Sequence, residues 1–153
     1  MASYEFITCK LNDAEWVIDI KGAATTSGTA LVNFPAKPTC NDNQLWTMEQ
    51  SKVLNTNGSG NTYWYFLKNK STNLVITVNK ASLEADTQKA TDNDDQLWEA
   101  NNADMPDGDG TEYYYLQNKK DGLVITIPEG TKKSGVPLQM AAQNDSENQQ
   151  WSI

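Results

Sequence analysis

The chain of 153 residues contains no histidine, two cysteines, and 12 basic side chains against 20 acidic ones. Without histidine, Ser-His-Asp and Cys-His nucleophile systems and the usual imidazole zinc sites are excluded. Two cysteines alone cannot complete a structural zinc site. The acidic stretches at 92–95 and 104–112 do not fit the EF-hand register, so we attribute them to turns. We therefore expect no metal and no cofactor.

The charge balance and the lack of long apolar runs exclude further partners. The net charge of −8 argues against nucleic acid and anionic membranes, which both need a patch of Lys or Arg. No apolar run reaches the roughly 18 residues of a membrane span. No basic region precedes an apolar stretch near Met1, so we expect no secretory signal, a cytoplasmic protein and a chain complete to Ile153. Cys9 and Cys40 are then expected to be free thiols, with a bridge as the alternative.

A Gln-x-Trp tripeptide occurs three times, at Gln44–Trp46, Gln96–Trp98 and Gln149–Trp151. The three glutamines stand 52 and 53 residues apart. A fixed period of this length indicates one supersecondary unit used three times, each unit too small to bury its own apolar face. We expect a single domain of residues 1–153 with three repeats, at about 1–50, 51–101 and 102–153.

Short β-branched and aromatic segments, broken by Gly, Pro, Asn and Asp, recur in every repeat. The strands expected in repeat one are Ser3–Cys9, Trp16–Ile20, Ala30–Phe34 and Leu45–Glu49. The matching segments of repeats two and three are Tyr63–Lys70 with Glu112–Lys119, and Asn73–Val78 with Gly122–Ile127. No segment has sustained helical periodicity, so the pattern predicts an all-β protein. Gln50–Thr62 and Asn101–Thr111 are expected to be flexible loops between repeats.

Three such repeats bury their aromatic residues best by converging on one axis, and closure also removes exposed sheet edges. Three four-stranded units that each end in Gln-x-Trp resemble the β-trefoil of ricin B-type lectins, and the resemblance covers the whole chain. It implies an all-β, single-domain β-trefoil with three pseudo-symmetric repeats. Trp46, Trp98 and Trp151 would then be core residues, with the glutamines fixing a nearby loop by hydrogen bonds.

The resemblance also implies the parts of a sugar site, and repeat one supplies them as Asp19, Phe34 and Asn43. The carboxylate would accept hydrogen bonds from two sugar hydroxyls, and the aromatic ring would stack on the apolar face of galactose. The carboxamide would bind a further hydroxyl. Gly22, in the turn after Asp19, and Gln44, next to Asn43, complete the predicted carbohydrate-binding residues.

Repeat one departs from the family pattern at two positions. Phe34 stands where Trp is commonest, and Val32 replaces a polar residue that often assists binding. A smaller stacking surface predicts weak affinity. Asn33 could replace the lost polar contact, but the alternation of a strand directs it to the opposite face.

Repeats two and three lack the full set. Thr77 and Thr126 replace the aspartate, and Asp95 replaces the asparagine of repeat two. Repeat three keeps Asn148 but has Ala141 at the stacking position. We therefore predict one galactose-type site, in repeat one.

The resemblance implies a non-enzymatic lectin for terminal galactose or N-acetylgalactosamine on glycoconjugates. Similarity to fungal cytoplasmic lectins implies a defensive role, and a homodimer would raise avidity from one weak site per chain. The alternative from another class is a β-trefoil protease inhibitor acting through exposed loops. A glycosidase is disfavoured because no acid pair is marked by position. A binding module cut from a larger enzyme is disfavoured because the chain looks complete.

Overall fold

The computed structural model describes residues 3–11, 15–79, 82–86, 93–103, 108–128, 131 and 133–153. Within these ranges the chain forms short strands and one-turn 3-10 helices, with no α-helix. The strands are β1 (Glu5–Phe6), β2 (Thr8–Cys9), β3 (Trp16–Ile20), β4 (Thr29–Pro35), β5 (Leu45–Leu54), β6 (Tyr63–Asn69), β7 (Val75–Asn79), β8 (Ser82–Asp86), β9 (Trp98–Asn102), β10 (Tyr114–Asn118), β11 (Val124–Thr126), β12 (Gln139–Ala141) and β13 (Trp151–Ser152). The 3-10 helices are η1 (Lys21–Ala23), η2 (Asp42–Gln44), η3 (Asp94–Gln96) and η4 (Glu147–Gln149). None of these helices has the length and apolar character needed to cross a membrane.

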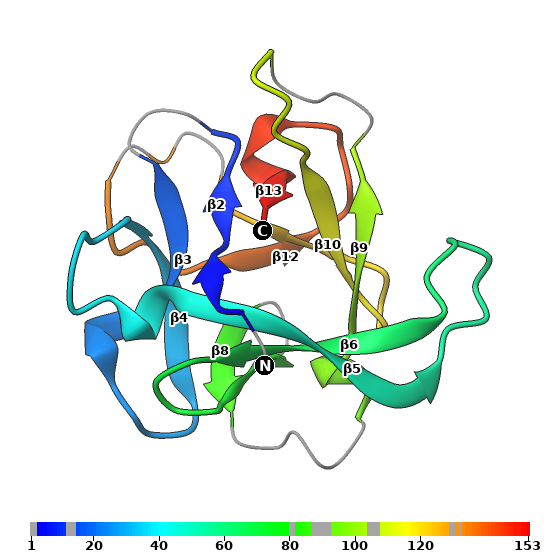
Figure 1. Ribbon diagram of the computed structural model, residues 1–153, viewed down its shortest axis with the longest axis horizontal. Coiled ribbons are helices and arrows are strands. Elements are labelled where there is room, and N and C mark those ends of the chain that lie inside the picture. Colours follow the sequence, from blue (N-terminus) through cyan, green and yellow to red (C-terminus); the bar gives the residue numbers. More distant parts are fainter. Residues whose placement is uncertain are drawn as a thin grey trace.

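Antiparallel pairing closes part of the sheet into a barrel (Figure 1). β1 pairs with β5, β5 with β6, β6 with β9, β9 with β10, β10 with β13, and β13 with β2, which follows β1 directly. The remaining strands form one hairpin per repeat: β3–β4, β7–β8 and β11–β12. β4 pairs with β8, β8 pairs with β12, and a bridge between Val32 and Pro137 joins the third hairpin to the first. A barrel closed by a triplet of hairpins is the β-trefoil, which confirms the predicted fold.

The three tryptophans of the repeated tripeptide occupy equivalent places in the core. Trp46, Trp98 and Trp151 are each 0% exposed. Their indole Nε1–H groups donate to the carbonyls of Ile18, Ile76 and Ile125 at 2.9, 3.0 and 3.0 Å respectively. A buried indole donor needs such a partner, and each repeat supplies it from the first strand of its hairpin. The expected scaffold role of these tryptophans is confirmed.

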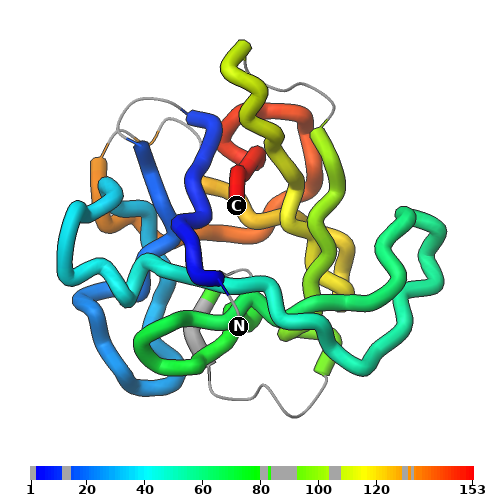
Figure 2. The backbone as a smooth tube through the Cα atoms, viewed as in Figure 1, coloured from blue at the N-terminus to red at the C-terminus, as the bar shows by residue number. Residues whose placement is uncertain are grey.

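Several strand boundaries differ from the predicted ones. Ile7, which is fully buried, interrupts the first strand between β1 and β2. Gln50–Leu54 continues β5 instead of forming a loop, and the connection between β5 and β6 projects from the body of the molecule (Figure 2). Pro35 belongs to β4, where it lies opposite Trp16. Proline is tolerated there because the position ends the strand. Residues 104–107 of the predicted second loop lie outside the described residues.

Both cysteines are free, as expected. Cys9 is buried and Cys40 is exposed. Burial raises the pKa of the Cys9 thiol to about 12, so this sulfur stays protonated and unreactive at neutral pH.

Candidate functional site

The backbone turns sharply beside the carboxylate of Asp19. Asp19 is the fourth of five residues in β3, and its side chain is 4% exposed. Helix η1 follows at once, and Gly22 (φ 65°) and Ala23 (φ 52°) both lie in the left-handed region. Alanine adopts that region only at a cost. The turn therefore bends the chain away from Asp19 and leaves one side of the carboxylate open.

Gln44 holds the carboxylate from behind. Its Nε2 donates to Asp19 Oδ2 at 2.8 Å and to the carbonyl of Pro35 at 3.1 Å. Its Oε1 accepts from the backbone N–H of Lys37 at 2.9 Å. Gln44 is 0% exposed, so the structure places this predicted sugar contact underneath the site. The geometry gives Gln44 the role of fixing Asp19 and the loop after β4.

Asn43 is paired with a lysine that sequence reasoning did not single out. Asn43 Nδ2 donates to the carbonyl of Ile20 at 3.2 Å, which fixes the carboxamide. Its Oδ1 accepts from Lys37 Nζ at 2.9 Å. An ammonium has three donors, and this bond uses one of them. Asn43 and Lys37 together present polar hydrogen next to the Asp19 acceptor.

Four of the five predicted residues line a single cavity of about 360 Å³. The cavity walls are Asp19, Lys21, Gly22, Ala23, Val32, Phe34, Lys37, Asn43 and Gly135. The Phe34 side chain is 37% exposed, which is unusual for a large apolar residue in this chain. The volume falls near the lower end of the roughly 300–1,000 Å³ typical of small-molecule sites.

The carboxyl of Asp19 titrates above its usual range. Burial raises its pKa, while the hydrogen bond from Gln44 and the positive charge of Lys37 lower it, and burial prevails. Desolvation disfavours the charged form, and Gln44, Lys37 and a hydrogen bond from Asn43 favour it.

Repeat three shows the same scaffold without the site. Gln149 Nε2 donates to Thr126 Oγ1 at 3.3 Å, in the place of Asp19, and to the carbonyl of Ala142 at 2.9 Å. Its Oε1 accepts from the backbone N–H of Asn144 at 2.8 Å, as Gln44 accepts from Lys37. Repeats one and three therefore share the backbone bond, whereas the bond from a lysine ammonium to the carboxamide is seen in repeat one and not among the described residues of repeat three. Asn148 Oδ1 is buried and finds no partner within the described residues.

The threonines at the aspartate position bond to their own strands. Thr77 Oγ1 donates to the carbonyl of Val75 at 3.3 Å, and Thr126 Oγ1 donates to the carbonyl of Val124 at 3.0 Å. Neither offers a carboxylate. The segment of repeat two between Thr77 and Asp95 includes residues 87–92, which lie outside the described part of the chain. The geometry of repeats two and three agrees with a single aspartate-based site.

The cavity also contains residues that the sequence did not indicate. Lys21 and Lys37 come from the hairpin and loop of repeat one, where Lys37 follows Phe34 by three positions. That spacing is the one signal that could have drawn attention to it. Gly135 comes from repeat three, and nothing in the linear sequence relates it to Asp19.

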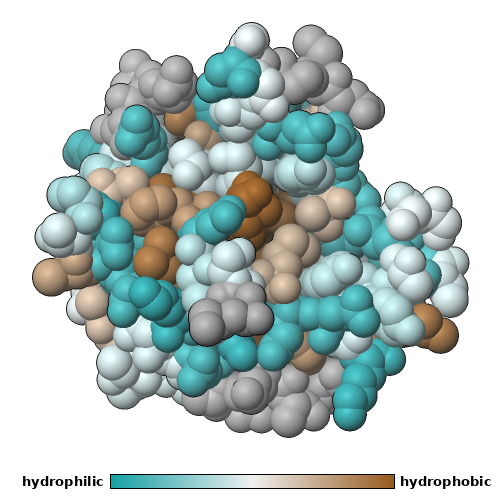
Figure 3. All heavy atoms as spheres, in the orientation of Figure 1, coloured by the Kyte–Doolittle hydropathy of each residue, from teal (hydrophilic) through white to brown (hydrophobic). Residues whose placement is uncertain are grey.

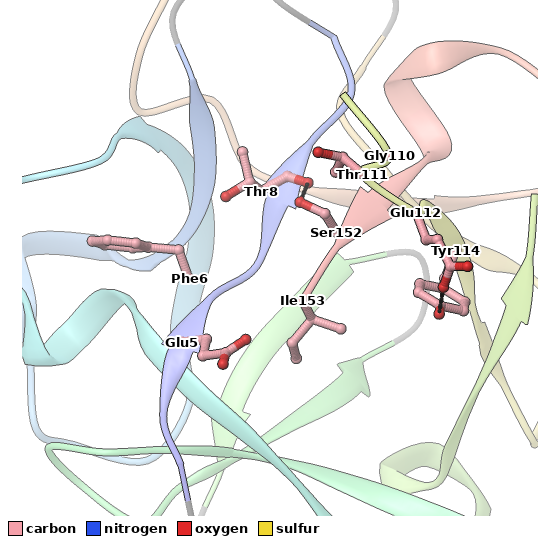
Figure 4. Close-up of a pocket in the computed structure, with 9 residues that line it drawn as sticks. All are labelled: Glu5, Phe6, Thr8, Gly110, Thr111, Glu112, Tyr114, Ser152 and Ile153. Atoms are coloured by element: carbon pink, nitrogen blue, oxygen red, sulfur yellow. Dashed lines mark hydrogen bonds between the residues drawn. The ribbon is translucent and has the colours of Figure 1, made fainter. Parts of the chain in front are cut away.

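A second, larger cavity of about 550 Å³ lies elsewhere, at the ends of the chain (Figure 4). Its walls are Glu5, Phe6, Thr8, Gly110, Thr111, Glu112, Tyr114, Ser152 and Ile153, which include none of the predicted site residues. Tyr114 donates to Glu112 Oε2 at 2.8 Å, and the Phe6 ring points away from both. The same face shows apolar side chains gathered over β13 and over β3 and β4, with hydrophilic ones around them (Figure 3).

Comparisons with known proteins agree with the fold. Residues 94–153 match the model of the family described as ricin-type beta-trefoil lectin domain-like. No curated protein matches the chain in sequence. The earthworm R-type lectin C-half, solved with GalNAc, is 18% identical with a TM-score of 0.66, covering 97% of this chain and 95% of that one.

Two further solved structures show how widely the fold is used. The designed threefold symmetric protein ThreeFoil is 18% identical, with a TM-score of 0.69 over 97% of this chain and 95% of that one. An exo-beta-1,3-galactanase from Clostridium thermocellum is 15% identical, with a TM-score of 0.74 over 99% of this chain. The chain spans 30% of the galactanase, in which the β-trefoil is one part of a larger protein. At these identities the likeness concerns the fold.

Proposed function

We propose that repeat one carries a non-catalytic binding site for terminal galactose or N-acetylgalactosamine on glycoconjugates. The observation that carries the proposal is the convergence of Asp19, Gly22, Phe34 and Asn43 on one cavity. The match of residues 94–153 to a lectin-type family and the lectins among similar structures support it.

The chemistry of the cavity suits a sugar. Asp19 accepts hydrogen bonds from adjacent hydroxyls, and charge-assisted bonds of this kind demand defined geometry. Asn43 and Lys37 donate to a further hydroxyl. The exposed face of Phe34 covers the C–H face of the pyranose ring. Because phenylalanine offers less surface than tryptophan, affinity near the millimolar scale, about 4 kcal/mol, is expected.

The cavity is built for binding and not for hydrolysis. Most glycosidases place two carboxyl groups on either side of the scissile bond. Among the described residues that line this cavity, Asp19 is the one carboxylate. We therefore assign Asp19 to recognition and propose no enzymatic activity.

Weak single sites become useful when several act together. We propose that two chains associate so that their repeat-one cavities engage one glycan-bearing surface. A cytoplasmic defence protein that acts after the producing cell is eaten fits this behaviour. This biological role extends the same proposal.

A glycan array with wild type, Asp19→Asn and Thr126→Ser tests the site. Wild type and Thr126→Ser should bind the same terminal galactosides, and Asp19→Asn should lose them. Binding that survives in Asp19→Asn would move the site to another part of the molecule. Absence of glycan binding, together with inhibition of a protease panel, would favour the loop-based inhibitor.

A further inference from the structure

The cavity of repeat one is completed by a turn from repeat three. Gly135 lines it together with Asp19, although Gly135 belongs to the segment that leads into β12. The bridge between Val32 and Pro137 brings this segment against β4. One wall of the cavity therefore depends on how the first and third hairpins of the trefoil meet.

Asn33 fastens that turn with all of its polar groups. Its Nδ2 donates to the carbonyl of Lys133 at 3.0 Å, and its Oδ1 accepts from the N–H of Val136 at 2.8 Å. Its backbone N–H donates to the carbonyl of Val136 at 3.1 Å, and its carbonyl accepts from the N–H of Gly135 at 2.7 Å. Asn33 is 0% exposed. It touches no ligand, and it positions the turn.

The cavity extends from Asp19 across β4 toward the third hairpin, because Val32 and Gly135 line it as well. Val32 lies opposite Asp19 across β3 and β4, and it bridges to Pro137 on its other side. Two inter-strand steps of about 4.8 Å each put roughly 10 Å between the backbones of Asp19 and Pro137. A pyranose bound to Asp19 and Asn43 is shorter than this. Gly135, which lines the cavity two residues before Pro137, therefore lies beyond the reach of that ring.

The far wall is bare backbone. Gly135 has a φ of +79°, and a Cβ built on it would meet no atom within 4 Å. Glycine in a left-handed turn allows a ligand to approach the main chain closely. The space in front of Gly135 is therefore open to a ligand that extends from the Asp19 end.

From this geometry we infer that the site takes two sugar residues, the second one lying against the Gly135 turn. This inference rests on the proposed function of repeat one and adds to it a preference for a galactosyl disaccharide over the single sugar. The linkage that directs the second ring toward Gly135 is the one preferred. Asn33 acts as a positioning residue for this second subsite.

The test compares methyl β-galactoside with a panel of galactosyl disaccharides of β1,3, β1,4, β1,6 and α1,3 linkage by calorimetry on the full chain. At least one disaccharide should bind about three- to tenfold more tightly than the methyl galactoside. If every disaccharide binds with the affinity of methyl galactoside, the second subsite is disproved while the proposed function stands. If neither kind of ligand binds, the proposed function fails as well.

A matched pair of variants locates the effect. Gly135→Asn fills the far wall with a side chain that tolerates positive φ. Gly58→Asn is the control, because Gly58 has a φ of +81° and equally open surroundings but does not line the cavity. Gly135→Asn should abolish the preference for the disaccharide over methyl galactoside, whereas Gly58→Asn should keep the preference of the wild type. An unchanged preference in Gly135→Asn would overturn the inference.

Amide chemical shifts of the wild type give a second readout that needs no variant. The preferred disaccharide should shift the amide signals of Gly135 and Val136, and methyl galactoside should not. Equal shifts at these amides with both ligands, or none with either, would contradict the second subsite.

Discussion

Gln44 Nε2 lies 2.8 Å from Asp19 Oδ2. The glutamine of the repeated Gln-x-Trp tripeptide thus fixes the carboxylate of the candidate sugar site. In repeat three the equivalent bond runs from Gln149 to the hydroxyl of Thr126 at 3.3 Å. The glutamine thus makes the same hydrogen bond in both repeats. In repeat one this bond becomes part of a binding site, because its acceptor is a carboxylate. The predictions below concern this carboxylate and the groups around it.

Asp19→Asn should abolish galactoside binding without destabilising the fold. The asparagine can still accept from Gln44 through its oxygen, which directs its NH2 group toward the ligand in place of an acceptor. Because burial raises the pKa of Asp19, the neutral side chain should leave the free energy of unfolding unchanged or slightly higher. Calorimetric titration and urea denaturation measure the two effects. Glu112→Gln, in the other cavity, is the control and should bind as wild type.

Binding should weaken as the pH falls, at a pH above the usual carboxyl pKa of 3.8. The ionised form of Asp19 accepts the sugar hydroxyls, and its raised pKa means that it protonates earlier than an exposed aspartate. The same shift makes the charged form unfavourable for stability, so protonating Asp19 does not by itself unfold the chain. Affinity measured across the acid range, with circular dichroism as a check on folding, tests this. A midpoint below 3.8 would contradict it.

Lys37→Met should move that acid midpoint to higher pH. Lys37 lowers the pKa of Asp19 by its positive charge, and its removal leaves burial less opposed. The variant also leaves Asn43 Oδ1 without its donor. We expect an affinity loss of about tenfold, equal to roughly 1.4 kcal/mol, from the lost donor. Lys120→Met, at an exposed position outside the cavity, should shift neither the midpoint nor the affinity.

Asn33→Ala should destabilise the protein by about 1–3 kcal/mol, because this fully buried side chain loses its hydrogen bonds to the Lys133 carbonyl and the Val136 N–H of the turn. Urea denaturation at neutral pH measures the change. Thr56→Ala, at an exposed position, should cost less than about 0.5 kcal/mol. A loss as small as that of the control would show that the turn does not depend on the Asn33 side chain.

Glu99→Gln should destabilise the connection between β5 and β6. Glu99 is 1% exposed, and five side chains donate to its oxygens. The donors are Asn55 (2.6 Å), Asn57 (2.8 Å), Ser59 (2.6 Å), Asn61 (3.5 Å) and Asn101 (3.2 Å). Burial raises the pKa of Glu99, but these donors outweigh it and hold the pKa below its usual 4.5.

The expected cost of Glu99→Gln is about 2–3 kcal/mol at neutral pH, since a carboxamide brings two donors where only acceptors fit. A lowered pKa means that the wild-type advantage is complete above 4.5 and disappears as the pH falls through the lowered value. Denaturation of both proteins at several pH values measures this. Glu49→Gln, which breaks a partly exposed pair with Lys68, should cost less than about 1 kcal/mol at any pH.

The predicted loop at Gln50–Thr62 was wrong for Gln50–Leu54, which continue β5, and the rest of it is the connection to β6. Its Gly and Asn content is typical of turns, but the carboxamides of Asn55 and Asn57 converge on a carboxylate some forty positions along the chain. The composition of a segment indicates how freely its own backbone can turn, but it does not reveal a hydrogen-bond acceptor far along the chain such as Glu99. The β-trefoil itself was predictable because the Gln-x-Trp tripeptide and the strand pattern recur three times at a nearly constant spacing.

The candidate site was likewise predictable from the sequence only in part. Asp19, Gly22, Phe34 and Asn43 could be grouped from sequence because they lie in one repeat, and the pairing of β3 with β4 brings them onto one cavity. The burial of Gln44 beneath Asp19 was not predicted, since spacing does not tell which side of a carboxylate a neighbour occupies.

The sequence by itself determined the repeat, the strands, the core tryptophans and the aspartate that distinguishes repeat one, because these depend on local periodicity and residue type. Tertiary structure alone decided that Lys37 binds Asn43 and that Gly135 of repeat three lines the same cavity. Both follow from how a loop folds over η2 and how the hairpins meet at Val32 and Pro137. The first contact depends on the path of one loop, whereas the second joins residues far apart in the sequence and exists only once the first and third hairpins have met.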